Sequence, residues 1–417
     1  MRSYSIVTEF DLVCENEYLV ELQTSILFVG YVFGAATLSW FVDNYGRKRV
    51  LFMSIGIVMA TGLVSVFVGN IYAFIACRFV TGFFLHGTFP QLNVMISEIV
   101  GNKYRAFANN ITFFAVACAF CVLALKGYLI NVYLDNNWKL LFVVCTAPYT
   151  FVLLFAFFVP ESVRYYRVKG ELDEAMAVFQ RIARWNNVDL PDDISITPIA
   201  PSNENRKANP LDLFRTRKMA RASCVFGWSV LTLNMAYYGL YYIAGDISGR
   251  LYSDFVLITI LDIPASLLLT ALLDRYGRRK CSMLFLLAAS LCCIGLGFVP
   301  MEGDLKVLRI ALGMIGKTSL SMSNMSQITW SLESFPTSIR GEASGLFQFL
   351  NKIGAAGSVW INRVLLDVYP GAVFLLYGGI NFVSVCLQVV LPETNGKILA
   401  DTEQDDVQAD DQLGEEK

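Results

Sequence analysis

Long apolar stretches recur along the whole chain, and their length restricts the fold more than any other feature. They lie at about residues 22–42, 50–69, 72–96, 106–126, 140–159, 223–243, 253–273, 281–300, 306–330, 342–365 and 372–391. Each is close to the roughly 20 residues that an α-helix needs to cross a bilayer. In lipid a backbone must satisfy its own hydrogen bonds, which a helix does within one segment. Charged residues make up only 16% of the chain, against about 25% in soluble domains. The sequence therefore predicts an all-α membrane protein with about eleven spans.

The chain also contains two copies of one pattern. A basic turn, Asp-Asn-Tyr-Gly-Arg-Lys-Arg at 43–49, has a counterpart at 274–280, Asp-Arg-Tyr-Gly-Arg-Arg-Lys. Downstream, Pro160-Glu161-Ser162 is matched by Pro392-Glu393-Thr394. Landmarks repeated in the same order mark a duplicated structural unit. We expect an N-terminal transmembrane half at 1–159 and a six-span C-terminal half at 223–391. Residues 160–222 would join them, and 392–417 would form an acidic tail.

The distribution of basic residues predicts the orientation. Most Lys and Arg lie in loops on the same side as the two basic turns. The opposite side has only Arg2, Lys126, Lys139, Arg250 and Lys306. Loops rich in Lys and Arg usually face the cytoplasm. We therefore expect the turns, the middle segment and the C-terminus in the cytoplasm. In the middle segment, apolar residues at helical spacing around 172–183 predict an amphipathic helix against the cytoplasmic ends of the spans.

The repeated landmarks resemble those of the major facilitator superfamily. Within it, the chain is similar to the organic-ion transporters of solute carrier family 22. Three segments carry this closer resemblance: Thr-Glu-Phe-Asp-Leu-Val-Cys at 8–14, Tyr-Tyr-Gly-Leu at 237–240 and Phe-Pro-Thr-Ser-Ile-Arg at 335–340. The resemblance implies a major facilitator fold of two repeated bundles and transport by alternating access. Relative to the twelve-helix family pattern, the first helix and a cysteine-rich loop are expected to be missing.

The resemblance further implies a cytoplasmic latch of acid–base clusters at the basic turns. Its expected members in the first half are Asp43, Gly46, Arg47, Glu98, Arg105 and Arg164. Those in the second half are Asp274, Gly277, Arg278, Glu333, Arg340 and Glu393. Such pairs would close the inner side in one state and separate in the other. The alternative is that the basic turns only anchor the topology.

Lys352 is the sharpest candidate for a contact with solute. It lies deep in the span 342–365, where a charge costs ~2.5–3.5 kcal/mol by insertion scales. The resemblance implies that this position is acidic in cation transporters and basic in anion and carnitine-type members. A lysine there would attract an anion or a carboxylate-bearing zwitterion. The alternative to a solute contact is a lysine that reaches the membrane surface or pairs with another residue of the chain. The preference for an anion is also weakened by Ser266, which stands where the resemblance implies a second lysine in many anion transporters.

Aromatic residues around this position predict the rest of a binding site. Tyr237, Tyr238 and Tyr241 lie on a span that would border the cavity, and Phe89 and Phe347 could face them. Aromatic pockets suit bulky amphiphilic solutes. Asp262 precedes Pro264, which should kink its helix, and it would either pair with a lysine or touch solute. The same spans contain Lys317, Arg309, Arg78 and His86, which we interpret first as structural, gating or packing residues.

The sequence therefore predicts a multi-pass carrier of small organic ions, leaning to an organic anion or zwitterion, in the plasma membrane. Its expected partners are the solute and the lipid bilayer. We find no pattern for a catalytic site, metal, cofactor or nucleic acid. One alternative is a truncated membrane isoform that does not transport. Another is a sugar-porter-like carrier, although the span 223–243 lacks the Gln-Gln-x-Ser-Gly element that a sugar-binding helix would need.

Overall fold

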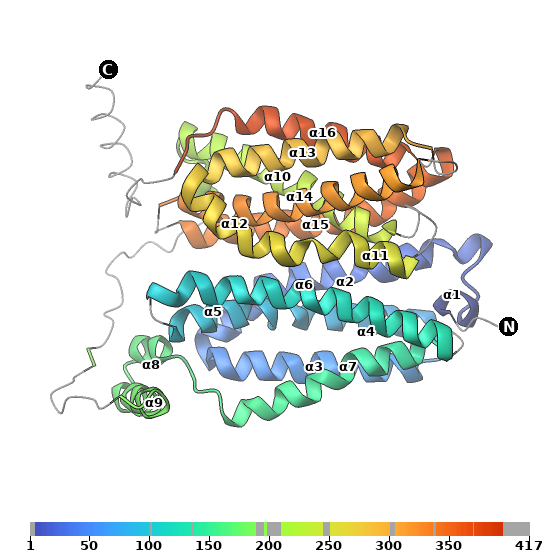
Figure 1. Ribbon diagram of the computed structural model, residues 1–417. Coiled ribbons are helices and arrows are strands. Elements are labelled where there is room, and N and C mark those ends of the chain that lie inside the picture. The colour runs from blue at the N-terminus through green and yellow to red at the C-terminus, as the bar shows by residue number, and fades with distance from the viewer. Residues whose placement is uncertain are drawn as a thin grey trace, which may run out of the picture. The chain divides into compact units, whose positions relative to one another are not determined.

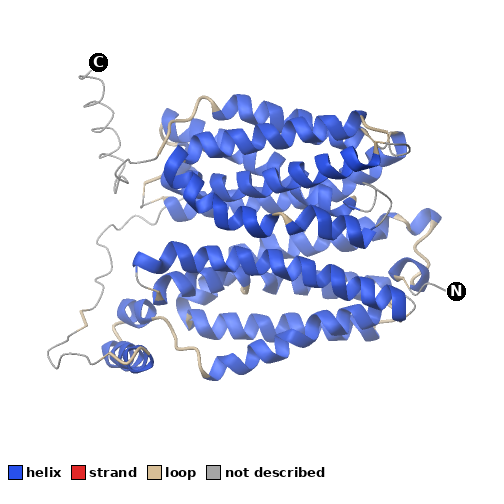
Figure 2. Cartoon of the chain, viewed as in Figure 1, coloured by secondary structure: helices blue, strands red, loops and turns tan. Residues whose placement is uncertain are grey.

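The computed structural model of the protein describes residues 5–100, 102–134, 137–188, 196–197, 210–244, 251–300, 305–336, 339–369 and 371–394. Throughout these ranges every regular element is a helix (Figure 2). The chain divides into two compact units. The first comprises Met1–Phe113 and Leu129–Lys207, and the second comprises Phe114–Tyr128 and Ala208–Lys417.

The first unit is built mainly from long helices (Figure 1). Its helices are α1 (Ile6–Glu9), η1 (Cys14–Asn16), α2 (Tyr18–Tyr45), α3 (Arg47–Phe67), α4 (Ile71–Leu85), α5 (Phe89–Ile99), α6 (Asn102–Tyr133), α7 (Trp138–Leu154), η2 (Phe155–Phe157), α8 (Val163–Lys169) and α9 (Leu172–Trp185). The middle of α6, Phe114–Tyr128, is grouped with the second unit. Helices α2 and α4 approach closely at Gly34, where a Cβ atom would lie 2.0 Å from the carbonyl oxygen of Phe83. Small residues permit such close packing where helices have little hydrophobic force between them.

The second unit consists of η3 (Pro210–Phe214), α10 (Arg217–Tyr242), α11 (Leu251–Ile260), α12 (Asp262–Tyr276), α13 (Arg278–Phe298), α14 (Lys306–Glu333), α15 (Arg340–Val368) and α16 (Ala372–Gln388). Helix α13 lies against α14 and α16, and α10 lies against α15 (Figure 1). Buried polar side chains connect these helices. The hydroxyls of Thr232 and Ser384 are 2.8 Å apart, and Gln388 donates to Ser229 at 2.6 Å. Such bonds satisfy polar groups that would otherwise be costly inside lipid.

Two predicted spans are divided in the structure. The sequence predicts one helix at 72–96. In the structure α4 ends at Leu85, and a second helix, α5, begins at Phe89 with Pro90 in its first turn. The stretch 253–273 separates at Leu261, and Pro264 lies in the first turn of α12. Proline lacks the N–H that a helix interior needs, but the first turn does not use it. The kink expected at Pro264 is thus a helix boundary.

The described helices are consistent with the predicted number of spans. Seven segments are long and apolar enough to cross a membrane: Cys14–Tyr45, Arg47–Phe67, Ile71–Ile99, Phe114–Tyr133, Trp138–Phe157, Tyr252–Leu269 and Arg278–Phe298. Helices α10, α14 and α15 are also long, with 26, 28 and 29 residues. Their interiors contain buried polar side chains such as Asn234, Lys317 and Asn351, which lowers their overall apolar character. Helix α16 is apolar but shorter, with 17 residues.

Candidate functional site

A buried carboxylate closes the turn between α2 and α3. Gly46 ends α2 with a φ of +102°, a conformation that glycine adopts without strain. Glu161 Oε1 and Oε2 accept from the backbone N–H of Lys48 at 3.0 and 3.1 Å. Oε1 also accepts from the N–H of Ser162 at 3.0 Å. The negative charge therefore lies at the N-terminus of α3, where free N–H groups and the helix dipole favour an anion.

The second unit repeats this arrangement at the start of α13. Gly277 has a φ of +90°. Glu393 Oε1 accepts from the N–H groups of Arg278 at 3.0 Å, Arg279 at 3.3 Å and Thr394 at 3.1 Å. We call these two arrangements the carboxylate braces: Glu161 on the α3 N-terminus and Glu393 on the α13 N-terminus. Glu161 was absent from the predicted latch, although the repeated Pro-Glu-Ser and Pro-Glu-Thr segments pointed to it.

Acid–base pairs flank each brace. Arg47 Nε lies 3.4 Å from Glu98 Oε2, and both side chains are largely buried. In the second unit, Arg278 Nε lies 3.2 Å from Glu333 Oε2. Glu333 also accepts from the Thr394 hydroxyl at 2.8 Å. These pairs join the ends of α3 and α5 in one unit and of α13 and α14 in the other.

Other predicted latch residues have different surroundings. Asp43 lies 3.6 Å from Arg47, with a side chain that is 73% exposed. Arg340 donates to the carbonyl oxygen of Phe335 at 3.3 Å. Arg164 is exposed on α8, and no ion pair is found for it among the described residues. The side chains of Arg105 and Asp274 lie outside the described part of the chain.

Tyr165 covers the brace of the first unit. Its hydroxyl donates to the carbonyl oxygen of Asn44 at 3.0 Å, and the Arg47 guanidinium lies 5.4 Å from its ring centroid. Burial and the nearby Glu161 carboxylate raise the pKa of Tyr165 above its ordinary 10.0. The phenol therefore keeps the proton that it donates.

A polar and aromatic seam runs between α10 and α14 in the second unit. Tyr237, Tyr238 and Tyr241 share one face of α10 with Asn234, because residues three and four apart lie together on a helix. On α14 the matching face carries Lys317, Ser321 and Asn324. One end of the seam is a bond from Asn324 Nδ2 to Asn234 Oδ1 at 3.5 Å. The other end is the Lys317 ammonium between two tyrosine rings.

Lys317 is completely buried, and its charge is matched by Asp262 from α12. The ammonium Nζ binds Asp262 Oδ2, which also accepts from the Ser321 hydroxyl at 3.0 Å. Nζ lies 5.3 Å from the ring centroid of Tyr237 and 4.5 Å from that of Tyr241. The sequence left open whether Asp262 pairs with a lysine or touches solute, and here it pairs with Lys317. Ser321 was not anticipated.

Lys352 lies on α15, half-buried, and faces a third tyrosine of α10. Its Nζ is 3.1 Å from the Tyr238 hydroxyl and 5.2 Å from the ring centroid. Tyr238 and Tyr237 stack edge to face, with centroids 5.3 Å apart. The structure therefore brings Lys352 beside the tyrosine row, with Lys317 further along the same row.

The two predicted phenylalanines are placed differently. Phe347 is 6% exposed and packs against Phe226 and Phe335, with ring centroids 5.9 Å away in both cases. It belongs to an apolar core cluster of the second unit. Phe89 belongs to the first unit, where it is 37% exposed at the start of α5.

The remaining basic residues of the spans make local contacts. Arg309 is buried, donates to the Val299 carbonyl oxygen at 2.6 Å and lies over the Phe374 ring. Arg78 lies over the rings of Phe74 and Phe142. His86 is buried against Tyr31, with ring centroids 5.1 Å apart. These contacts agree with a structural interpretation of all three residues.

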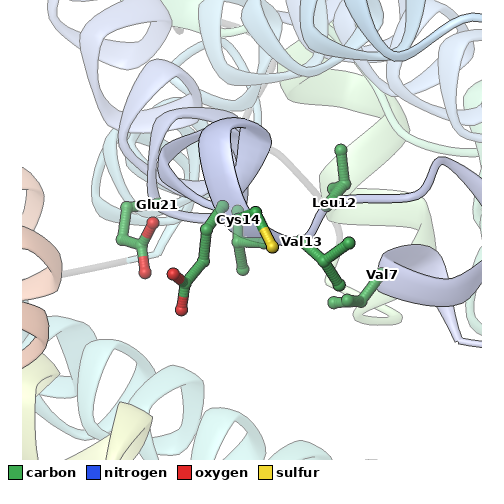
Figure 3. Close-up of a pocket in the computed structure, with 7 residues that line it drawn as sticks. Val7, Leu12, Val13, Cys14 and Glu21 are labelled. Atoms are coloured by element: carbon green, nitrogen blue, oxygen red, sulfur yellow. The ribbon is translucent and has the colours of Figure 1, made fainter.

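The first unit has a pocket at the N-terminal end of α2 (Figure 3). Three valines and Leu12 form the apolar part of its wall, together with Cys14, whose thiol is free and exposed. The lining residues are Val7, Leu12, Val13, Cys14, Glu17, Val20 and Glu21. Across the described side chains, no group of three or more His, Cys, Asp or Glu is arranged to hold a metal ion.

Comparison with known proteins gives one family and many relatives. The model of the family described as "Sugar (and other) transporter" matches residues 4–405. Solute carrier family 22 member 3 of Rattus norvegicus is 29% identical over 96% of this chain and 71% of its own length. Member 13 of Homo sapiens is 28% identical over 97% of this chain and 72% of its own length. The organic cation transporter-like protein of Drosophila melanogaster is 26% identical over 95% and 72%.

Solved structures with the same fold are also found. The inward open conformation of the xylose transporter XylE from E. coli aligns with a TM-score of 0.72 at 15% identity, covering 95% of this chain and 91% of that one. The XylE structure with 6-bromo-6-deoxy-D-glucose, described as a major facilitator superfamily symporter, gives 0.68 at 16% identity over 94% and 91%. The predicted major facilitator fold and the resemblance to solute carrier family 22 are confirmed.

Proposed function

Because the chain belongs to the sugar (and other) transporter family, we propose that it carries a small organic ion across a membrane by alternating access. Members 3 and 13 of solute carrier family 22 are its relatives at 29% and 28% identity over most of the chain. The solute proposed is an organic anion or a zwitterion with a carboxylate. The expected membrane is the plasma membrane, with the C-terminus in the cytoplasm.

The surroundings of Lys352 are the observation that supports this choice of solute. Lys317 is fully buried and paired with a carboxylate, whereas Lys352 is half-buried and lies beside the Tyr238 phenol. In this proposal the Lys352 ammonium would attract an anionic group of the solute and repel a cationic one. Tyr238 would supply an aromatic surface beside that charge.

Uptake of three matched probes tests the proposal: an anion, a zwitterion and a cation of similar size and apolar surface. The variant is Lys352→Asp, with Lys352→Arg as the control that keeps the charge. A charge-assisted hydrogen bond contributes about 1.5–3 kcal/mol, which is roughly a 10- to 150-fold effect on anion uptake. Lys352→Asp should lose that uptake, while Lys352→Arg keeps a substantial part of it. Preference for the cation, unaffected by Lys352→Asp, would reject the choice of solute.

A cationic solute is the main rival, because a relative of this chain is named an organic cation transporter-like protein. The same three probes decide between the two. A sugar is the second rival, since the matching fold includes a xylose transporter. Hexose or pentose uptake that is insensitive to Lys352→Asp would favour it. Uptake of none of these solutes by protein that reaches the cell surface would favour a membrane protein that does not transport.

The acid–base pairs at the two braces would act as the latch in this cycle. Arg47 with Glu98 and Arg278 with Glu333 are the pairs that support this role. Glu98→Gln and Glu333→Gln should weaken the closed inner side, so that a cysteine introduced on the cytoplasmic face reacts faster with a thiol reagent. Equal reaction rates in wild type and variants would show that the pairs only anchor the helix ends.

A further inference from the structure

We infer that the second unit contains a binding site for a small alkylammonium ion that the chain fills with its own Lys317. The site consists of the Asp262 carboxylate, the Ser321 hydroxyl and the rings of Tyr237 and Tyr241. This inference rests on the proposed function and deepens it, because it states which part of the tyrosine row is closed to a solute. It depends only on contacts inside the second unit.

The arrangement around the Lys317 ammonium is that of a cation-binding pocket. A carboxylate oxygen contacts Nζ, and the same oxygen is held by Ser321 at 3.0 Å. Two ring centroids lie 5.3 and 4.5 Å from Nζ, within the roughly 6 Å over which a ring face attracts a cation. The tyrosine hydroxyls are 3.3 Å apart, which connects the two rings. Ammonium ligands are recognised by this combination of aromatic faces and a carboxylate.

The occupant is tethered and excluded from solvent. The Lys317 side chain has 0% exposure, and that of Asp262 has 9%. A buried ion pair loses its hydration, and removing one partner leaves the other charge uncompensated. Without Lys317, the buried Asp262 carboxylate would therefore favour the binding of another cation. A free ammonium of the right size is the simplest replacement.

The same geometry separates two parts of the tyrosine row. Tyr237 and Tyr241 face Lys317, whereas Tyr238 faces Lys352 at 3.1 Å. With Lys317 in place, an amine cannot reach Asp262 without displacing a covalently attached competitor. Under the proposed function, the solute contact on this row would then be Lys352 with Tyr238, which would favour a negative group. Lys317 is thus a specificity-determining residue that acts by occupying the cation site.

Propylammonium binding to Lys317→Ala tests the inference. This substitution removes three methylenes and the ammonium, the same atoms that n-propylammonium supplies. The full chain is purified in detergent, and its thermal unfolding is followed with increasing n-propylammonium chloride. Sodium chloride and 1-propanol at matched concentrations control for ionic strength and for apolar binding.

The expected result is a saturable rise in the Tm of Lys317→Ala, by about 2 °C or more near saturation, with no comparable rise in wild type. The rise should disappear in Lys317→Ala/Asp262→Asn, which lacks the carboxylate. In Lys317→Ala/Tyr241→Leu the affinity should fall by roughly 2- to 30-fold, the range expected for one cation–π contact. A folded Lys317→Ala that does not respond to the amine overturns the inference. So does an equal response of wild type and variant.

Failure of Lys317→Ala to fold is also informative. In that case the variant is expressed and purified with and without propylammonium. Recovery of folded protein only with the amine supports the site. Loss of the single variant under both conditions, with recovery of Lys317→Ala/Asp262→Asn, would show that a free ammonium cannot replace the lysine, and would overturn the inference. Since no step measures uptake, the inference can stand if the proposed transport fails, and the reverse also holds.

Discussion

Replacing Glu393 by glutamine should loosen the α12–α13 turn, and the size of the effect follows from the contacts of the carboxylate. Glu393 Oε1 accepts from three backbone N–H groups, two of them at the start of α13. Glutamine keeps an acceptor oxygen but loses the charge. Hydrogen bonds to a charged group contribute about 1.5–3 kcal/mol, against about 0.5–1.5 kcal/mol for neutral ones. An anion at a helix N-terminus adds about 0.3–1 kcal/mol. We expect Glu393→Gln to lower the free energy of unfolding by about 1–3 kcal/mol.

Thermal unfolding of the purified chain in detergent measures this change. For a unit of about 200 residues, 1 kcal/mol corresponds to a Tm shift of roughly 2–4 °C. The predicted decrease for Glu393→Gln is therefore about 2–12 °C. Glu161→Gln should give a decrease of similar size, because Glu161 makes the equivalent bonds to Lys48 and Ser162. Asp11→Asn, at an exposed position in a turn outside the helices, is the control for loss of a carboxylate charge and should shift the Tm by less than about 2 °C.

A double variant sharpens the test. Glu161 and Glu393 belong to different units and bond to different helix N-termini, so their effects on the free energy should add to within about 0.5 kcal/mol. Tm decreases no larger than that of Asp11→Asn would refute the reasoning. Such a result would mean that the carboxylates lie at the helix N-termini without stabilising them.

Two further predictions concern local geometry. Gly277→Ala should lower the Tm, since it places a Cβ atom at a φ of +90° and 2.7 Å from Glu393 Oε2, a conformation that costs about 1–2 kcal/mol. Gly379→Ala, whose Cβ atom would meet nothing within 4 Å, is the control, and an equal effect of both substitutions would contradict the explanation. Glu9→Gln should release the segment before α2, because Glu9 accepts from Trp138 Nε1 at 2.7 Å and pairs with Lys139 at 2.5 Å. Amides of residues 6–12 should then exchange hydrogen roughly 2- to 10-fold faster, and unchanged exchange would show that the apolar contacts of the segment suffice.

Much of the fold could be predicted because membranes restrict the possibilities. Apolar length and the repeated turns at 43–49 and 274–280 were sufficient for an all-helical, duplicated fold. The division of the helix at 86–88 was missed, since the intervening His86, Gly87 and Thr88 do not interrupt the apolar pattern strongly. The sequence also did not show which polar residues face inward. Helices such as α14 keep Lys317 and many serines buried because neighbouring helices supply their partners.

The candidate site was predicted as a set of residue types rather than as pairs. Lys352 was identified from its charge inside a span, and the tyrosines from their spacing on one helix. Only the structure shows that Lys352 bonds to Tyr238. The pairing of Asp262 with Lys317 joins residues 55 positions apart, and nothing in a single sequence specifies such a distance. Glu161 could have been predicted as a partner of the first basic turn, because the repeat aligns it with Glu393. Its role depends on backbone N–H groups, which carry no signature in the side-chain sequence.

The sequence separation of each brace has a consequence for biosynthesis. Glu161 lies 113 residues after Lys48, and Glu393 lies 115 residues after Arg278. Ribosomes deliver the N-terminal part of a chain first, and units generally fold as they emerge. The first unit can therefore secure its turn while α10 and the helices after it are still being translated. Within each unit, however, the turn is made long before its carboxylate, so α3 and α13 both enter the membrane with a helix N-terminus that no carboxylate yet neutralises. An insertion chaperone would stabilise either helix most during this interval.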